Sequence, residues 1–130
     1  MDRARIEAAV RSHCASREDI AAVYLHGSQA RGTARTASDV DVAVLYRDRP
    51  PPGLEALSLG LEAELERDLG VPVQAITLNT APPELVHRVL HDGCLLLERD
   101  ASARVRFEVR ARNEYFDLKP YLDEYRRAPA

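Results

Sequence analysis

A glycine–serine pair and a doublet of aspartates, set between two apolar runs, constrain this chain more than any other feature. The segment 27–41 reads GSQARGTARTASDVD, with apolar residues before it (20–25) and after it (42–45). In an extended strand, successive side chains alternate between the two faces, so Asp39 and Asp41 are expected to point the same way. Two neighbouring carboxylates repel one another unless a cation shares them, and Mg²⁺ prefers oxygen ligands of this kind. The two aspartates are therefore a predicted magnesium site.

The start of the same segment has the features of a phosphate-binding turn. Gly27 lets the backbone approach a ligand closely, and Ser28 offers a hydroxyl at the start of a helical turn. Exposed N–H groups at such a turn suit a phosphate. Together with the aspartates, these residues predict a binding site for a nucleoside triphosphate with Mg²⁺.

Length, charge and cysteine content limit the class of protein. A chain of 130 residues is predicted to form a single domain over 1–130. The net charge of −3 argues against binding nucleic acid or membranes through charge alone. No apolar run approaches the ~20 residues that a membrane helix needs, and the charged N-terminus is unlike a signal peptide. Cys14 and Cys94 have no metal-ligand spacing and are predicted to be reduced, so we expect a cytoplasmic protein.

Hydrophobic periodicity predicts an α/β or α+β domain with a small mixed sheet. Helices are predicted over 2–15, from 54 to a stop at Gly70, from 82 to a stop at Gly93, and over 101–127. A short helical turn over 28–31 ends at Gly32, and strands are predicted over 20–26, 39–46, 71–78 and 94–97. Polar or proline-rich connections are predicted over 33–38 and 47–53, and Pro120 should bend the last helix.

The spacing of the motif resembles the signature of the DNA polymerase β-like nucleotidyltransferase superfamily. Ten residues separate Gly27-Ser28 from Asp39-Val40-Asp41, as in the pattern GS, ten residues, DxD. The resemblance narrows to the minimal nucleotidyltransferases of the MNT or MntA type, on the residues 27–32, 38–41, 78–85, Gly93, 98–100 and 107–120. It implies the nucleotidyltransferase fold, a small mixed β-sheet flanked by helices, with a long C-terminal helix.

The resemblance also implies an activity and a partner. Members of this family often act as antitoxins of a HEPN-domain ribonuclease toxin and transfer AMP from ATP to a tyrosine of that toxin. By this resemblance, Asp39 and Asp41 would be the catalytic metal ligands of a two-ion Mg²⁺ site. Gly27, Ser28 and Arg31 would bind the nucleotide, although Arg31 is as well suited to a surface salt bridge.

Two positions of the third predicted strand depart from the family pattern. Members usually carry a third metal-binding aspartate on the third strand, where this chain has Gln74, and a second acidic residue where it has Thr77. An amide oxygen can coordinate Mg²⁺ but brings no negative charge and cannot accept the proton of a nucleophile. The chain is thus either an active AMP transferase or a catalytically weakened pseudoenzyme that neutralises its partner by binding alone. A nucleotide-responsive regulatory module with no toxin is a third possibility.

Two further sets of residues allow more than one interpretation. His26, where the family pattern leads us to expect an apolar or aromatic residue, is interpreted as a structural histidine rather than a catalytic base. The last helix carries a set of apolar residues, Val105, Val109, Tyr115, Phe116, Leu118, Tyr121, Leu122 and Tyr125. We expect this set to belong to the core, with a partner surface as the alternative.

Overall fold

The computed structural model describes residues 1–32, 38–48 and 54–127, of which 54–58 are described by their backbone only. In chain order the elements are α1 (Arg3–Cys14), β1 (Ile20–His26), α2 (Gly27–Arg31), β2 (Val40–Tyr46), α3 (Leu54–Leu69), β3 (Val73–Thr77), the 3₁₀ turn η1 (Leu78–Thr80), α4 (Pro83–Asp92), β4 (Cys94–Glu98) and α5 (Ala101–Arg127). The predicted helices and strands are confirmed, with differences of a few residues at their ends. The predicted connections over 33–37 and 49–53 lie outside the described residues.

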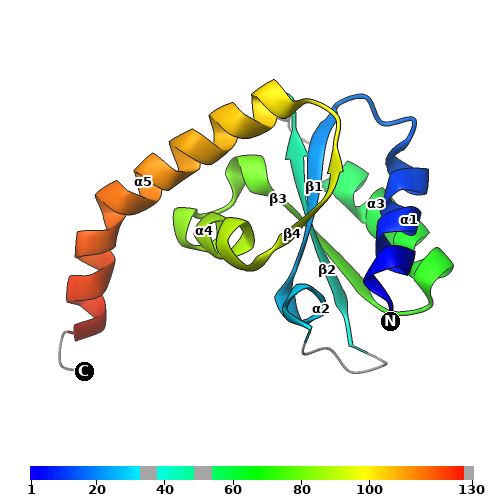
Figure 1. The fold of residues 1–130 in the computed structure, drawn as a ribbon, viewed down its shortest axis with the longest axis horizontal. Helices are drawn as coiled ribbons and strands as arrows, with labels where there is room; N and C mark the ends of the chain where they lie inside the picture. The colour runs from blue at the N-terminus through cyan, green and yellow to red at the C-terminus, as the bar shows by residue number, and fades with distance from the viewer. Residues whose placement is uncertain (33–37, 49–53, 128–130) are drawn as a thin grey trace.

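The strands form one mixed sheet in the order β3-β2-β1-β4 (Figure 1). β1 is antiparallel to β2 and to β4, whereas β2 and β3 are parallel. The register places His26 opposite Asp41 on β1 and β2, and Asp41 opposite Gln74 on β2 and β3. The small mixed sheet predicted from the sequence is therefore confirmed.

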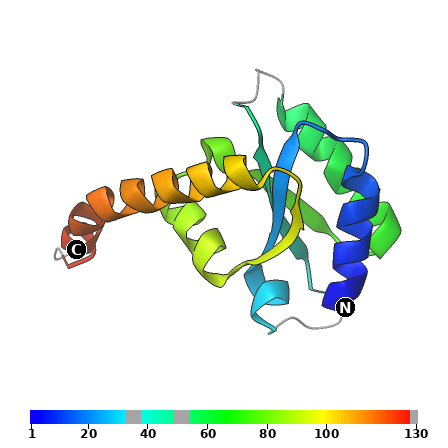
Figure 2. The same cartoon turned by 45° about the horizontal axis from the view of Figure 1, so that its top comes forward.

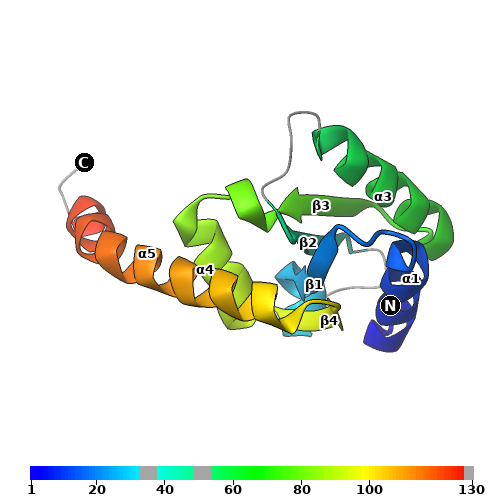
Figure 3. The same ribbon diagram turned by 90° about the horizontal axis from the view of Figure 1, so that it is seen from above.

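Helices cover both faces of this sheet. Figure 3 shows α1 and α3 against one face and α4 and α5 against the other. On the first face, Ile6 and Val10 of α1 and Leu61 and Leu65 of α3 pack with strand residues such as Val42. On the second, buried residues include Tyr24, Ala43, Leu45, Val86, Val89 and Phe107. Neighbouring residues of a strand contribute to different faces, as Val42 and Ala43 of β2 do, because side chains alternate between the two faces of a sheet.

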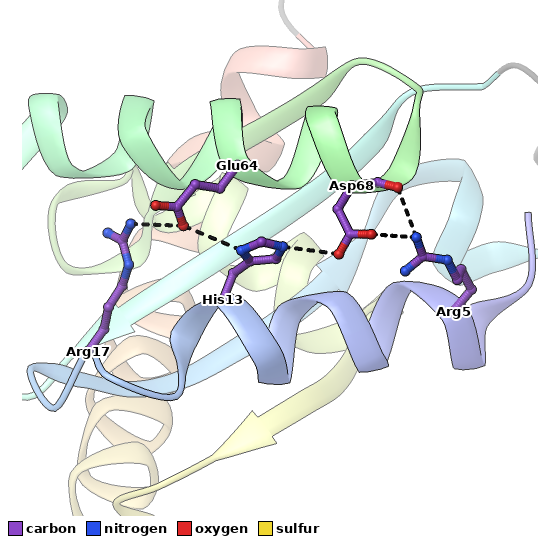
Figure 4. Close-up of polar contacts among 5 residues, drawn as sticks. All are labelled: Arg5, His13, Arg17, Glu64 and Asp68. Atoms are coloured by element: carbon purple, nitrogen blue, oxygen red, sulfur yellow. Dashed lines mark hydrogen bonds and ion pairs between the residues drawn. The ribbon is translucent and has the colours of Figure 1, made fainter.

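A row of polar contacts joins α1 and Arg17 to α3 (Figure 4). His13 Nε2 lies 3.0 Å from Asp68 Oδ2, and His13 Nδ1 lies 3.6 Å from Glu64 Oε2. Arg5 pairs with Asp68 at one end, and Arg17 Nη2 lies 3.3 Å from Glu64 Oε2 at the other. The hydrogen bonds from Arg5 and His13 hold the pKa of the Asp68 carboxyl below its usual value.

The outer edge of β3 is blocked by side chains of α3. The N–H of Ala75 donates to Glu62 Oε1 at 2.7 Å, and the N–H of Val73 donates to Glu66 Oε1 at 2.9 Å. An edge strand otherwise offers these N–H groups to a strand of another chain. Glu62 and Glu66, four residues apart on one helix face, satisfy them within the chain.

The last helix is long, as predicted, but only its first half belongs to the core. Ala103, Phe107 and Ala111 are buried against the sheet, and the phenol of Tyr24 donates to Glu108 Oε1 at 2.6 Å. Figures 1 and 2 show the rest of α5 leaving the body of the molecule and changing direction in its C-terminal part, where Pro120 lies.

The expectation that the apolar residues of this helix are core is wrong for most of them. The exposed members of the set are Val105, Val109, Phe116, Leu118, Tyr121 and Tyr125. Tyr115 is half-buried because its ring stacks on His87 of α4, with centroids 3.6 Å apart.

Among the described helices, none combines the length and apolar character needed to cross a membrane. Cys14 and Cys94 are both free thiols.

Candidate active site

The predicted triphosphate site lies where β1 ends and β2 begins. Gly27 follows the last residue of β1 and has φ +71°, a left-handed conformation that side chains rarely adopt. A Cβ atom at this position would lie 2.4 Å from Oδ2 of Asp41. Glycine therefore allows the Asp41 carboxylate to lie directly against the backbone of the turn. The structure thus brings together the glycine and one aspartate of the sequence motif.

The short helix α2 is tied to its surroundings on both sides. Gln29 is buried, and its Nε2 donates to the carbonyl of Ser38 at 3.3 Å, just before β2. Arg3 of α1 donates to the carbonyl of Ala30 at 3.0 Å. These bonds hold the turn that contains Ser28 close to the segment that enters β2. Sequence reasoning missed Gln29 because a glutamine in a polar motif resembles a surface residue.

The two aspartates and Gln74 lie at the start of β2 and on its neighbour β3. The strand begins at Val40, so Asp39 lies just before it and is exposed, whereas Asp41 is half-buried. The N–H of Val40 donates to the carbonyl of Pro72 at 2.9 Å and fixes this end of the sheet. Asp41 and Gln74 are paired in the parallel ladder, so they are neighbours on the same face. An exposed amide thus lies beside Asp41 where the family resemblance leads us to expect a carboxylate.

His26 lies beside this site, opposite Asp41 in the β1–β2 ladder. Its Nε2 is buried and has no hydrogen-bond partner within the described part of the chain. Burial lowers the pKa of His26, the nearby Asp41 carboxylate opposes that shift, and the charges of Arg88 and Arg31 add to it. Arg88, on α4, was not singled out from the sequence, since only the fold brings α4 next to β1. Arg31 is exposed on α2 and, among the described residues, forms no ion pair.

The donor set at this end of the sheet fits one magnesium ion bound together with a nucleotide. Over residues 1–32, 38–48 and 59–127, no cluster of three or more His, Cys, Asp or Glu side chains forms a closed metal site. Mg²⁺ in nucleotide-binding proteins commonly takes one or two carboxylates and completes its shell with phosphate oxygens and water. Asp39 and Asp41 suit that arrangement. Gln74, the described residue paired with Asp41 on β3, would bring no charge to a second ion.

Comparisons with known proteins identify the family of the chain. The family described as "Polymerase beta, Nucleotidyltransferase" matches residues 9–102. A solved protein assigned as a minimal nucleotidyltransferase is 36% identical, with 71% of this chain and 89% of that chain covered and a TM-score of 0.55. No curated protein matched the chain.

Two more distant structures match over nearly the whole chain. A toxin–antitoxin structure with AMP-PNP matches at 21% identity and a TM-score of 0.71, covering 92% of this chain and 97% of that chain. A complex of a tri-AMPylated HEPN toxin with an MNT antitoxin from Shewanella oneidensis matches at 19% identity and a TM-score of 0.64, covering 92% and 95%. These two likenesses concern the fold. With the family match over residues 9–102, the chain belongs to the polymerase β-type nucleotidyltransferase family and has its α+β fold.

Proposed function

We propose that residues 1–130 form a single-domain antitoxin that binds ATP with Mg²⁺ and transfers AMP to a tyrosine of a partner HEPN-domain toxin in the cytoplasm. The observation that carries this proposal is the contact between Gly27 and Asp41, which sets a carboxylate against a glycine turn. The similar toxin–antitoxin structures support it, because one holds the ATP analogue AMP-PNP and another contains an AMPylated toxin.

Each predicted site residue has a role in this reaction. Gly27 and Ser28 would face the terminal phosphates, Arg31 would add a charge-assisted contact, and Asp39 and Asp41 would hold the magnesium ion. When bound, that ion would stabilise charge on the phosphate oxygens and help to ionise the attacking hydroxyl. The tyrosine oxygen forms a bond to the α-phosphorus, the bond to the β-phosphate oxygen breaks, pyrophosphate leaves and the phenolic proton passes to solvent.

A second candidate function is supported by Gln74. This amide lies next to Asp41 in the parallel ladder and supplies no charge for a second ion. A chain with one weakly held ion could keep its nucleotide and its partner yet transfer AMP slowly. In that case the chain would neutralise the toxin by binding alone.

A labelling experiment distinguishes the two functions. The chain and the HEPN-domain protein encoded beside it are incubated with α-labelled ATP and Mg²⁺, and the modified residue is located by mass spectrometry. Label on a partner tyrosine, lost in Asp41→Asn, is the expected result. Absence of label, with toxin neutralisation intact in Asp41→Asn, would leave binding alone as the function.

Variants at position 74 test the reason given for slow transfer. Gln74→Asp should raise the rate of AMP transfer by about tenfold or more if a carboxylate beside Asp41 completes a second ion site. Gln74→Asn has the same side-chain length as that variant without the charge, so it serves as the matched control. Equal rates in the two variants would show that position 74 does not contact the metal.

A further inference from the structure

A cleft of about 540 Å³ lies at the opposite end of β2 from the candidate active site. It opens beside Tyr46, the last residue of β2, roughly 17 Å along the strand from Asp41 at ~3.3 Å per residue. Its lining is mixed, with charged residues beside the buried apolar side chains of Leu45, Leu78 and Phe107. The cleft is thus separate from the residues to which the reaction has been assigned.

Two arginines of α5 border the cleft. Arg106 and Arg110 are four residues apart on one helix face, where like charges repel one another. The carboxylates that also line the cleft belong to Asp48 and Glu114, and among the described residues neither pairs with these arginines. The guanidinium carbon of Arg110 lies 5.9 Å from the ring centroid of Phe107. This wall therefore favours an occupant that carries negative charge.

An exposed apolar stripe continues from the cleft along the same face of α5. Leu118, Tyr121 and Tyr125 follow Glu114 at spacings of four, three and four residues, which keeps them on one side of a helix. They are 37%, 70% and 82% exposed, so exposure rises along the stripe. Figure 2 shows this half of α5 projecting from the body of the molecule. We call the cleft and this stripe together the α5 groove.

The dimensions of the α5 groove suit a helix. From Ala103 to Glu114 the cleft follows α5 for roughly 17 Å at ~1.5 Å per residue, the length of about three helical turns, and the stripe continues past the bend at Pro120. An amphipathic helix binds such a groove through apolar residues spaced three and four apart. Addition of a strand at the β3 edge is less suited, because Glu62 and Glu66 already satisfy N–H groups there.

We propose that the α5 groove is the docking site for an amphipathic helix of the partner protein, with carboxylates of that helix against Arg106 and Arg110. The proposal rests on the proposed function only in that a protein partner exists. It separates docking from chemistry, because the partner is held at one end of β2 while its reacting side chain reaches the other. A folded domain of ordinary size spans that distance.

The test compares two exposed faces of the same helix. The double variants Tyr121→Glu/Tyr125→Glu and Arg106→Glu/Arg110→Glu alter the groove. Val105→Glu/Val109→Glu is the matched control, since these valines are 47% and 48% exposed and lie on the opposite face of α5. Binding of the adjacent HEPN-domain protein is measured by calorimetry, and binding of ATP with Mg²⁺ is measured on the same samples.

The expected result is a loss of partner affinity of roughly 30-fold or more in both groove variants, as for central aromatic and arginine contacts. The control should stay within about threefold of the wild type, and all three variants should bind nucleotide as the wild type does. Wild-type affinity in the groove variants, or equal loss in the control, would overturn the groove while leaving the proposed function intact.

Two other outcomes would also overturn the proposal. If the wild-type chain binds nucleotide but not the HEPN-domain protein, the partner in the proposed function is wrong and the docking site falls with it. If the chain alone sediments as a dimer that the groove variants abolish, the occupant is a second copy of the chain.

Discussion

Replacing Gly27 with alanine should destabilise the chain and weaken nucleotide binding for two separate reasons. The backbone at Gly27 has φ +71°, where an L-residue costs about 1–2 kcal/mol. In addition, the new Cβ would lie 2.4 Å from Oδ2 and 3.3 Å from Cγ of Asp41, well inside contact distance. The carboxylate must move away, or the turn must shift, and either change removes Asp41 from its place against the Gly27 turn.

Gly70 supplies a matched control for the backbone cost. It has φ +72°, and a Cβ built there meets nothing within 4 Å. Gly70→Ala should therefore lower the free energy of unfolding by about 1–2 kcal/mol and leave affinity for ATP with Mg²⁺ within about twofold. Gly27→Ala should lose at least about tenfold in that affinity, which corresponds to about 1.4 kcal/mol.

Urea unfolding and calorimetry of ATP with Mg²⁺ measure the two effects separately. In an Asp41→Ala background the steric conflict is absent, so Gly27→Ala should then cost only the backbone energy, as Gly70→Ala does. Equal stability and equal nucleotide affinity of the two glycine variants, each in the otherwise unchanged chain, would show that no steric conflict with Asp41 exists.

Three further predictions concern stability. Glu62→Ala and Glu66→Ala should each lower the free energy of unfolding, measured in urea, by about 1–3 kcal/mol, because each leaves a strand N–H unpaired. Glu7→Ala is the control, since it breaks an exposed i,i+4 pair and should cost under about 0.5 kcal/mol. Burial raises the pKa of the Cys14 thiol from 9.0 to about 11. The stabilisation that comes from the neutral thiol is therefore complete below pH 9.0 and lost as the pH rises toward 11. Cys14→Ala should flatten the pH dependence of the urea midpoint in that range. Arg5 and His13 of α1 lower the pKa of Asp68. The stabilisation that comes from the ionised carboxylate is therefore present above pH ~4 and lost as the pH falls. In thermal melts, Asp68→Asn should lose less stability on acidification than the wild type.

Local signals in the sequence predicted the elements that carry the candidate site. The apolar run before Gly27 became β1, with the predicted bounds of Ile20 and His26. Gly32 ends α2 in the left-handed conformation with φ 73°, as expected of a glycine after a helical turn. The strand after the motif starts at Val40, one residue later than predicted. The assignment of chemical roles to Asp39 and Asp41 stays a prediction.

Contacts between segments that are distant in the chain could not be predicted from the sequence. No local pattern shows that Gln29 bonds to Ser38 or that glutamates of α3 satisfy the edge of β3, because these bonds depend on how whole elements pack. The interpretation of the last helix failed for a related reason. Periodicity identifies which residues share a face of a helix, but it does not show where the body that covers this face ends, and Tyr121 lies beyond it.

The central claim is that Asp41, lying against the Gly27 turn, holds magnesium together with a triphosphate. Calorimetry of ATP with the wild type and with Asp41→Asn, each in Mg²⁺ and in EDTA, tests it most directly, with Asp48→Asn past the other end of β2 as the control. We expect Mg²⁺ to strengthen ATP binding by about tenfold or more in the wild type and the control but hardly at all in Asp41→Asn. Equal binding with and without Mg²⁺, or an undiminished effect of Mg²⁺ in Asp41→Asn, would contradict the claim.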